Sequence, residues 1–289
     1  MLDVIITLEA TCDLENEQIE KYNLSIIDMD FEVDGEQFST QNDGVVSSKL
    51  YEKMIQKKKT GTSQINAFNY EKYFEKLLKQ NKPILHIAFS SGLSGTGAVA
   101  KQVAEELNKK HDNKIYVVDS LCACSGHGLL GVVARDYANK CDDIGELVAF
   151  VESVKLKIMH FFTVDSLTYL ANGGRIESKK AFFGNLLNIK PVMQMSTIGT
   201  LEVMHKVISR KKSISSIASL VEKTFDENYS YWFISHANCL QDALMLKEKI
   251  ETTTSLKPII THLGPVIGCH SGPGTLAVFF IAKEERKKL

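Results

Sequence analysis

Four short apolar runs in the first half of the chain do most to constrain its fold. They lie at Val4–Ile6, Leu24–Ile27, Ile84–Phe89 and Ile115–Val118. None alternates strictly between polar and apolar residues, as expected for strands that are buried on both faces of a parallel sheet. Parallel strands need long crossover connections, which are usually helices. The runs therefore predict a βαβ architecture.

Helical periodicity lies between and after these runs. Apolar side chains recur at i, i+3, i+4, i+7 and i+8 over Tyr70–Leu78, and every four residues over Val99–Leu107. Each stretch therefore has one apolar face that can pack on a sheet. Asp143 with Glu146 resembles a capping box, which predicts one more helix that ends near Lys155.

The pattern changes after residue 155. Two helical segments near 213–227 and 239–251 now separate longer apolar stretches, which predicts an α+β unit. The predicted strands are Ile158–Val164, Pro191–Met195, Tyr231–Ile234, Ile259–His262 and Leu276–Ile281. A charge run from Lys283 to Lys288 is interpreted as a frayed terminus. Because 289 residues exceed the usual single-domain size, we expect an α/β domain over 1–155 and an α+β domain over 156–289.

Charge and hydropathy exclude several classes of function. The charges of the 34 Lys and Arg residues nearly cancel those of the 35 Asp and Glu residues. The chain therefore has no large positive net charge that would attract nucleic acid or an anionic membrane. Met1 leads directly into the first strand without signal-peptide features, and no apolar run approaches the roughly 20 residues that span a bilayer. We expect a cytoplasmic protein with no nucleic-acid partner and no integral membrane segment.

The cysteines form no metal or redox motif. They lie scattered at Cys12, Cys122, Cys124, Cys141, Cys239 and Cys269, without a C-x-x-C unit. We interpret them as buried thiols and expect no metal site. Cys269 precedes His270, but neighbours on a strand point to opposite faces, which argues against a nucleophile with its base.

The most informative segment is the turn Phe89–Gly97, between a predicted strand and a predicted helix. It holds three serines, a threonine and three glycines. Glycines let the backbone approach a ligand, and the first turn of the helix offers unpaired N–H donors. Such a turn at the carboxyl end of a strand suits a small anion, either carboxylate or phosphate. The alternative is an ordinary helix cap, for which one serine suffices.

Other functional interpretations of this turn remain open. A nucleotide P-loop is excluded because Ala98 and Val99 follow Gly97, where Lys and Ser/Thr are required. Gly95–Ala100 does match G-x-G-x-x-A, with Asp119 placed as a ribose-binding acid, although five extra residues follow the strand. A dinucleotide-binding oxidoreductase is therefore one alternative. A serine-loop hydrolase is another, although the G-x-S-x-G elbow is absent.

A second hydroxyl-rich turn, Thr60–Gln64, precedes the helix over Tyr70–Leu78. If both turns follow neighbouring strands, their hydroxyl groups converge on one anion, because parallel strands end at the same edge of a sheet. Thr62 and Ser63 are then the candidates in this second turn. Taken alone, the stretch also fits an ordinary loop that leads into a helix.

Six motifs that occur in order along the chain resemble the DegV family. They are Thr62–Gln64, Ser90–Thr96, Val118–Ser120, Gly173–Ile176 after Asp165–Leu170, Lys190-Pro191, and Gly268–Gly274. The resemblance spans nearly the whole chain. It implies two domains that enclose one long-chain fatty acid, with the tail in an apolar tunnel and the carboxylate at the domain junction. It also implies the lipid-binding subunit of a two-part fatty acid kinase, whose partner carries ATP, rather than a stand-alone enzyme with a cofactor.

The resemblance also assigns hydroxyl ligands for the carboxylate. They fall on Thr62 or Ser63 and, in the serine turn, on Ser91 and Ser94 with Gly92 between them. The assignment makes physical sense, because a buried carboxylate without donors or a counter-charge costs several kcal/mol. Hydroxyl and N–H groups supply these donors without a permanent ion pair.

Two further residues are implied to assist phosphoryl transfer by the partner. They are Arg175 in the Gly-Gly-Arg motif and His270 in the last motif, with His270 also beside the ligand. An arginine can stabilise a transferring phosphoryl group, and a protonatable histidine can assist. Without the resemblance, Arg175 is equally a surface arginine after a tight turn, and His270 a satisfied core histidine.

The sequence departs from the family pattern at its first strand. Relatives usually carry Thr-Asp-Ser or similar there, whereas Leu8-Glu9-Ala10 precedes Thr11 in this chain. One hydroxyl is missing and the acid is longer, so we expect an altered site at this point. Cys124 and His127 follow a loop that is more often apolar or amide-bearing in relatives, and we assign them core or rim positions.

Overall fold

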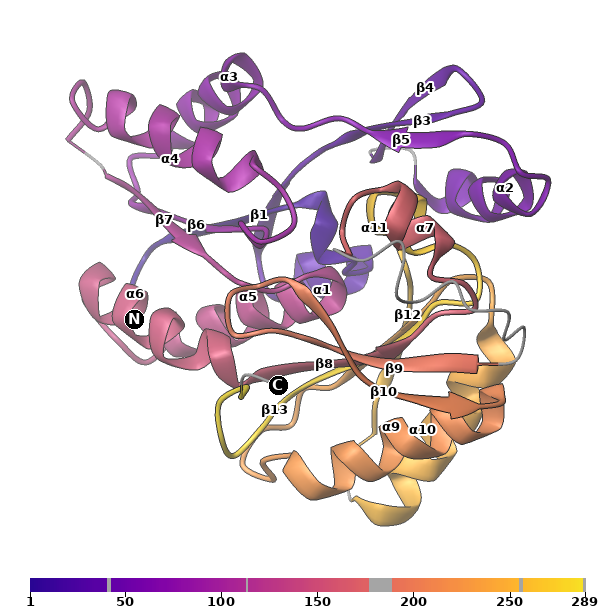
Figure 1. Cartoon of the computed structure of the whole chain (residues 1–289). Coiled ribbons are helices and arrows are strands. Elements are labelled where there is room, and N and C mark those ends of the chain that lie inside the picture. Colours follow the sequence, from indigo (N-terminus) through magenta and orange to yellow (C-terminus); the bar gives the residue numbers. More distant parts are fainter. Residues whose placement is uncertain (41–42, 113, 177–188, 255–256, 288–289) are drawn as a thin grey trace.

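The computed structural model describes residues 1–40, 43–112, 114–176, 189–254 and 257–287. Within these ranges the strands form a parallel sheet of four strands, a mixed sheet of six and a small antiparallel sheet of three (Figure 1). The predicted fold class is confirmed. The division at residue 155 stays a prediction, since the largest apolar cluster takes residues from both halves, among them Leu8 and Phe279.

The parallel sheet has the strand order β2-β1-β6-β7. Its strands are β1 (Ile5–Glu9), β2 (Leu24–Ile27), β6 (Ile84–Ala88) and β7 (Ile115–Asp119). All four predicted runs are therefore strands. Figure 1 shows two helices on each face: α3 (Ala67–Leu78) and α4 (Thr96–Leu107) on one, α5 (Cys124–Ala138) and α6 (Ile144–Val154) on the other.

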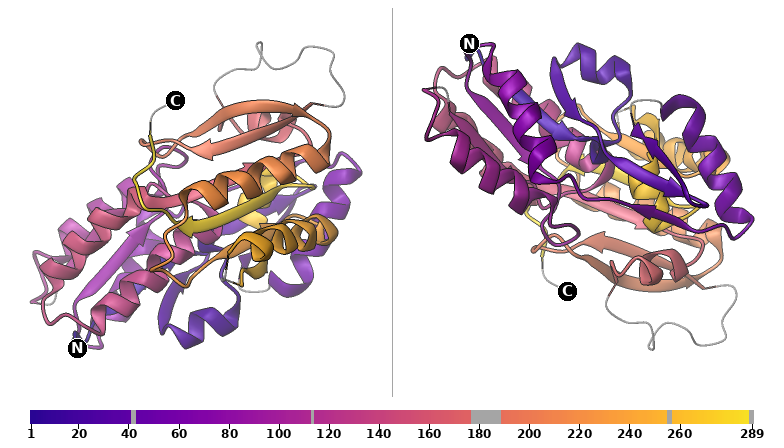
Figure 2. Two further views of the ribbon diagram at one scale, coloured as in Figure 1. Left: turned by 90° about the horizontal axis from the view of Figure 1, so that it is seen from below. Right: turned by 90° about the horizontal axis from the view of Figure 1, so that it is seen from above.

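The mixed sheet of the second half has the order β10-β9-β8-β13-β11-β12. Its strands are β8 (Ile158–Thr163), β9 (Ile189–Met195), β10 (Leu201–Ile208), β11 (Phe233–His236), β12 (Ile259–His262) and β13 (Leu276–Ile281). The two predicted helices, α9 (Arg210–Thr224) and α10 (Leu240–Thr253), cover one face of this sheet (Figure 2). The sequence does not predict β10, because this edge strand is only partly buried and carries polar residues.

Helix α5 is the longest element that the sequence does not predict. It is buried on nearly every side, so it lacks the one-sided periodicity of a surface helix. It packs on β1 and β6 and also on β8, β11 and β13. Glycines permit this close approach, since a Cβ at Gly126 would lie 2.3 Å from His160 and one at Gly131 would lie 2.9 Å from Leu8. The helix therefore joins the two halves.

A small sheet of β3 (Asp30–Val33), β4 (Glu36–Ser39) and β5 (Thr60–Thr62) is also unpredicted. Because β5 pairs with β3, the Thr60–Gln64 turn does not follow a strand of the parallel sheet, contrary to expectation. Helix α11 (Pro265–Ser271) packs on α2 (Asp43–Ile55), β3 and β5. The remaining helical segments are η1 (Ala10–Cys12), α1 (Asn16–Lys21), η3 (Lys155–Lys157) and α7 (Thr168–Asn172).

The charge run after β13 is not simply a frayed terminus, although its last lysine, Lys288, lies outside the described residues. Arg286 is only 5% exposed, and its guanidinium donates hydrogen bonds to three carbonyl oxygens. Nη1 donates to Leu121 at 2.9 Å and Ser196 at 3.1 Å, and Nη2 donates to Lys155 at 3.1 Å. The side chain therefore ties the C-terminal segment to both halves.

Replacing Arg286 by alanine should lower the free energy of unfolding by about 2–4 kcal/mol, because it leaves three largely buried carbonyl groups without their donor. Urea denaturation followed by circular dichroism measures this. Lys287→Ala is the matched control, since its side chain is 79% exposed, and it should leave the midpoint unchanged. Equal denaturation midpoints for the two variants would show that the hydrogen bonds of Arg286 add nothing to stability.

Candidate functional site

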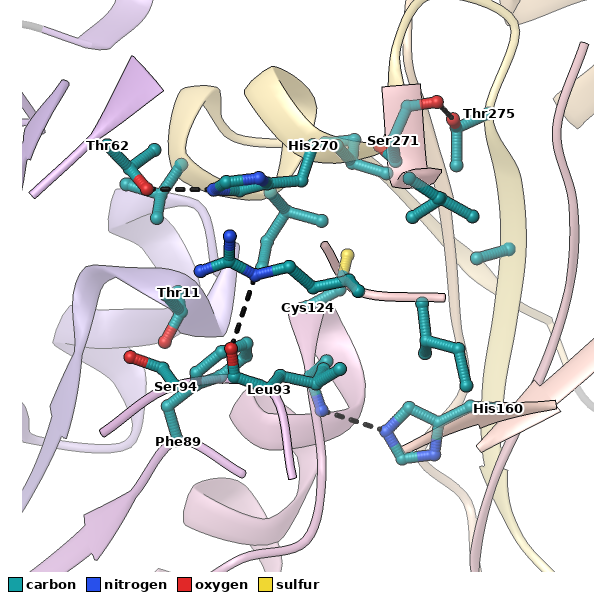
Figure 3. Close-up of a pocket in the computed structure, with 18 of the residues that line it drawn as sticks. Thr11, Thr62, Phe89, Leu93, Ser94, Cys124, His160, His270, Ser271 and Thr275 are labelled. Atoms are coloured by element: carbon teal, nitrogen blue, oxygen red, sulfur yellow. Dashed lines mark hydrogen bonds between the residues drawn. The ribbon is translucent and has the colours of Figure 1, made fainter. Parts of the chain in front are cut away.

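A largely apolar cavity lies between the two halves (Figure 3). Together with the open solvent at its mouth, its empty space is about 920 Å³. Its apolar wall consists of Met29, Phe89, Leu93, Phe162, Leu170, Met195, Leu201, Leu263, Val266, Ile267, Ala277 and Phe279. These residues come from both ends of the chain, so the cavity exists only in the assembled fold.

Hydroxyl groups from the two predicted turns reach this cavity. Thr62, Ser63 and Ser94 line it together, although β5 brings Thr62 there from the small sheet. The Ser94 hydroxyl donates to Thr96 Oγ1 at 3.0 Å and accepts from the Thr96 N–H at 3.2 Å. Thr62 Oγ1 lies 2.8 Å from His270 Nε2. The convergence of the two turns is thus found, while the role of these residues as ligands stays a prediction.

Ser91 and Gly92 do not line the cavity. The Ser90 hydroxyl donates to the carbonyl of Gly199 at 2.7 Å, and Gly92 lies so close that a Cβ there would be 2.5 Å from Gly199. This docks the first part of the serine turn on the β9–β10 turn and leaves Ser91 exposed. The expectation that Ser91 and Gly92 face the anion is therefore not met by the geometry.

Arg175 and His270 meet beside the hydroxyl groups. Arg175 Nε donates to the carbonyl of Leu93 at 3.3 Å, which links the turn after α7 to the serine turn. His270 belongs to α11 rather than to a strand. Burial, and then the charge of Arg175, lower the pKa of His270 to about 4. At neutral pH the imidazole is therefore neutral and hydrogen-bonded to Thr62.

Cys269 does not form a catalytic pair with His270. Burial raises the pKa of the Cys269 thiol to about 12, so the thiol is protonated at neutral pH. Of the two neighbours, His270 lines the cavity and Cys269 does not. The six cysteines are free, and five of them are buried as predicted, whereas Cys239 is only partly buried.

The polar groups deeper in the cavity are also neutral. His160 Nε2 accepts from the Ala123 N–H at 3.1 Å, and Nδ1 lies 3.0 Å from the carbonyl of Ile158. Burial, and then Arg286, hold the pKa of His160 well below its ordinary range. Burial, and then Asp13, raise the pKa of the Cys124 thiol well above its ordinary value. This part of the cavity therefore suits an apolar ligand segment.

The altered acid of the first strand is buried behind the cavity. Glu9 accepts from the Tyr70 hydroxyl at 2.8 Å and from the Phe89 N–H at 2.9 Å, and it lies 3.3 Å from His86 Nε2. Burial alone would raise the pKa of Glu9, but His86 and the other partners outweigh it and lower the pKa to about 2. Glu9 is therefore an ionised group that fixes the start of the serine turn.

The residues of both alternative functions have structural partners. A Cβ at Gly95 would lie 3.1 Å from Gln64 Nε2, and Asp119 Oδ1 accepts the N–H groups of Ser91 and Leu121. The hydroxyl of Ser94 donates to Thr96, where a hydrolase would pair it with a histidine. The geometry therefore favours neither an oxidoreductase nor a hydrolase.

Among residues 1–40, 43–112, 114–176, 189–254 and 257–287, no group of three or more His, Cys, Asp or Glu side chains is placed to hold a metal ion. No helix in these same ranges has the length and apolarity to cross a bilayer.

Comparison with known proteins identifies the fold and the family. A family model described as "uncharacterised protein, DegV family" matches residues 3–283. A DegV domain-containing protein of Clostridium perfringens is 36% identical over 97% of this chain and 98% of its own. A solved DegV lipid-binding protein of Thermotoga maritima is 26% identical, with a TM-score of 0.84 over 99% of this chain and 100% of its own. A solved stearic-acid-binding protein of Eubacterium ventriosum is 24% identical, with a TM-score of 0.86 over 98% and 99%.

The charge of Arg175 should have a measurable effect on the pKa of His270. Arg175→Ala should raise the pKa of His270 above about 4, but not to its ordinary value of 6.5, because burial is the larger cause and remains. Below its pKa the imidazole is protonated, so the variant should protonate at higher pH. NMR titration of the ring resonances measures this, and Arg175→Lys should keep the original value. An unchanged pKa in Arg175→Ala would assign the whole shift to burial.

Proposed function

The chain belongs to the DegV family, and we propose that it binds one long-chain fatty acid in the cavity between its halves. One observation carries the proposal: an apolar cavity that has the hydroxyl groups of Thr62, Ser63 and Ser94 gathered in its wall. A fatty acid has the same division into an apolar tail and an anionic head. The relatives from Thermotoga maritima and Eubacterium ventriosum, which bind lipid and stearic acid, support the assignment.

The head group needs donors that can be released from their present partners. The Ser94 hydroxyl now donates to Thr96, and the Thr62 hydroxyl lies against the neutral His270. Each hydroxyl can rotate to donate to a carboxylate, and a hydrogen bond to an ionised group contributes about 1.5–3 kcal/mol. These groups together offset the cost of burying the carboxylate.

The tail gains its binding free energy from burial. Phenylalanine, leucine and methionine side chains from both halves line the wall, and each buried methylene contributes about 0.8 kcal/mol. The neutral states of His160 and Cys124 avoid placing a charge against the tail. Affinity should therefore rise with chain length until the cavity is filled.

Ser94→Ala should weaken binding of a long-chain fatty acid roughly tenfold, because one hydrogen bond to a carboxylate is lost and 1.4 kcal/mol corresponds to a factor of ten. Ser91→Ala is a matched control from the same turn, since Ser91 is exposed and outside the cavity wall. It should bind like the unaltered chain. Native mass spectrometry of purified protein and titration with myristate provide the two measurements. Protein that never carries or binds a fatty acid would disprove the proposed function.

We further propose that the chain presents its fatty acid to an ATP-dependent kinase subunit, as the family resemblance implies. Arg175 and His270 lie at the hydroxyl-lined end, where a phosphoryl group would approach the carboxylate. The guanidinium could then stabilise the negative charge of the transferring group. This role differs from holding the ligand, so the two roles can be separated by mutation.

Arg175→Ala and His270→Ala should retain bound fatty acid yet lose most acyl-phosphate formation when combined with ATP and the kinase subunit of the same organism. A loss of about tenfold or more corresponds to removing one stabilising contact from the transition state. Lipid content by mass spectrometry and ATP consumption by a coupled assay are measured on the same samples. If Arg175→Ala empties the cavity, the residue binds the ligand and the proposed division of roles is wrong.

A further inference from the structure

A buried histidine stands directly behind one cavity hydroxyl that the sequence did not single out as a ligand. Thr11, from η1, lines the cavity, and its Oγ1 lies 3.3 Å from Nδ1 of His127. Figure 3 shows the hydroxyls of Thr11 and Ser94 directed to the same region. His127 itself is fully buried in α5 and does not line the cavity. Any influence of His127 on a ligand must therefore pass through Thr11.

The hydrogen bonds of His127 fix which way the Thr11 hydroxyl points. His127 Nε2 lies 2.7 Å from the carbonyl oxygen of Ile87, which can only accept, so Nε2 carries a hydrogen. In a neutral imidazole Nδ1 then has no hydrogen and must accept from Thr11 Oγ1. Thr11 consequently turns its lone pairs toward the cavity. A carboxylate beside Thr11 would then face only the lone pairs of the hydroxyl oxygen and would receive no hydrogen bond from this residue.

Protonation of His127 reverses this arrangement. With a hydrogen on Nδ1, the imidazolium donates to Thr11 Oγ1, and the Thr11 hydroxyl hydrogen is free to point into the cavity. Thr11 then becomes a donor for an anionic ligand. The step takes one proton from solvent onto Nδ1 and rotates one hydroxyl group, without any other change in bonding.

We propose that Thr11 is a further ligand hydroxyl of the cavity and that His127 takes up one proton when a carboxylate binds. The proposal rests on the proposed fatty-acid binding, because it requires an anionic head group near Thr11 and Ser94. It assigns His127 a positioning role, since the residue acts on the ligand only through Thr11. It also makes fatty-acid binding dependent on pH.

The charged surroundings of His127 are compatible with both protonation states. Glu9 in β1 lies 3.7 Å from His127 Nε2 and favours the imidazolium, as does Asp119 at the end of β7. His86 in β6 opposes it, and His160 in β8 lies close enough to interact.

The other elements packed on α5 are β11, β13, α6 and η1. The first three contribute apolar residues such as Phe233, Phe279 and Leu147 to the shared core. From η1, Cys12 is protonated, because burial raises its pKa to about 12. The other ionisable groups of these elements are Asp13 at the end of η1, Glu146 and Glu152 in α6, and His236 in β11. None of them is among the main influences on the pKa of His127.

The direction of the pH dependence follows from burial. Burial is the largest influence on His127 and lowers its pKa below 6.5, so the residue is neutral at pH 7.5 without ligand. A carboxylate held by Thr11 adds negative charge and raises the pKa. Between the pKa of the free protein and that of the complex, affinity should fall by up to about tenfold for each unit of rising pH. Below the pKa of the free protein this dependence should disappear.

The test is calorimetric titration of delipidated full-length protein with myristate at pH 7.5, in two buffers that differ in ionisation enthalpy. The difference in observed heat gives the number of protons taken up, which should exceed zero and should approach one at a pH between the pKa of His127 in the free protein and its pKa in the complex. Thr11→Val should abolish this uptake and weaken binding several-fold, whereas Thr11→Ser, which keeps the hydroxyl, should retain both.

Thr7→Val is the matched control. It removes another buried threonine hydroxyl, which is 2.6 Å from the hydroxyl of Tyr73 and lies outside the cavity wall. This variant should bind myristate and take up protons as the unaltered protein does. A loss of proton uptake in both valine variants would point to general destabilisation and overturn the assignment to Thr11.

The outcomes separate this inference from the proposed function. Absence of myristate binding disproves the function itself. Binding without proton uptake, or uptake that persists in Thr11→Val, leaves the function intact and overturns the role of His127. If Thr11→Val does not fold, the nitrogen chemical shifts of His127 decide the question in the unaltered protein. Nδ1 must change from unprotonated to protonated when myristate is added.

Discussion

The ionised carboxylate of Glu9, buried at the end of β1, is the interaction on which the site depends. A charge without access to water must be surrounded by donors, and Glu9 takes them from three separate elements. Tyr70 comes from α3, His86 from β6, and the Phe89 N–H from the first residue of the serine turn. The loss of any one of these partners would leave the buried charge without a hydrogen bond, which costs free energy. The first residue of the serine turn is therefore held in place beside the cavity.

The low polarity of the buried surroundings then determines the protonation state of the other ionisable groups around the cavity. Burial lowers the pKa of His160, His127 and His270 and raises that of Cys124, so each of them is neutral near pH 7. Neutral groups can lie against an acyl tail, while hydroxyl groups supply hydrogen bonds that reorient with the ligand. The positive charge of Arg175 remains at the hydroxyl-lined end, where an anion is expected.

Sequence patterns predict the elements whose burial is one-sided or uniform along a short strand. The four parallel strands, α3, α4, α6 and five strands of the mixed sheet all have such patterns. Helix α5 has none, because both halves bury it. Strands β3, β4 and β10 are short or partly exposed, and polar residues interrupt their apolar ones. Cap chemistry was the other reliable signal, since Asp143 accepts from the Glu146 N–H as predicted.

Only those residues of the site that stand out by local composition could be predicted from the sequence. Hydroxyl-rich turns gave Thr62, Ser63 and Ser94, but the direction of Ser91 depends on its neighbour Ser90 docking on Gly199, more than 100 residues away. Thr11 shows the same limit more strongly. Its sequence neighbourhood indicated only an altered strand end, whereas its chemistry depends on Nδ1 of His127, and that in turn on the carbonyl of Ile87. A hydroxyl's role as donor or acceptor is set by this chain of contacts, which no local pattern records.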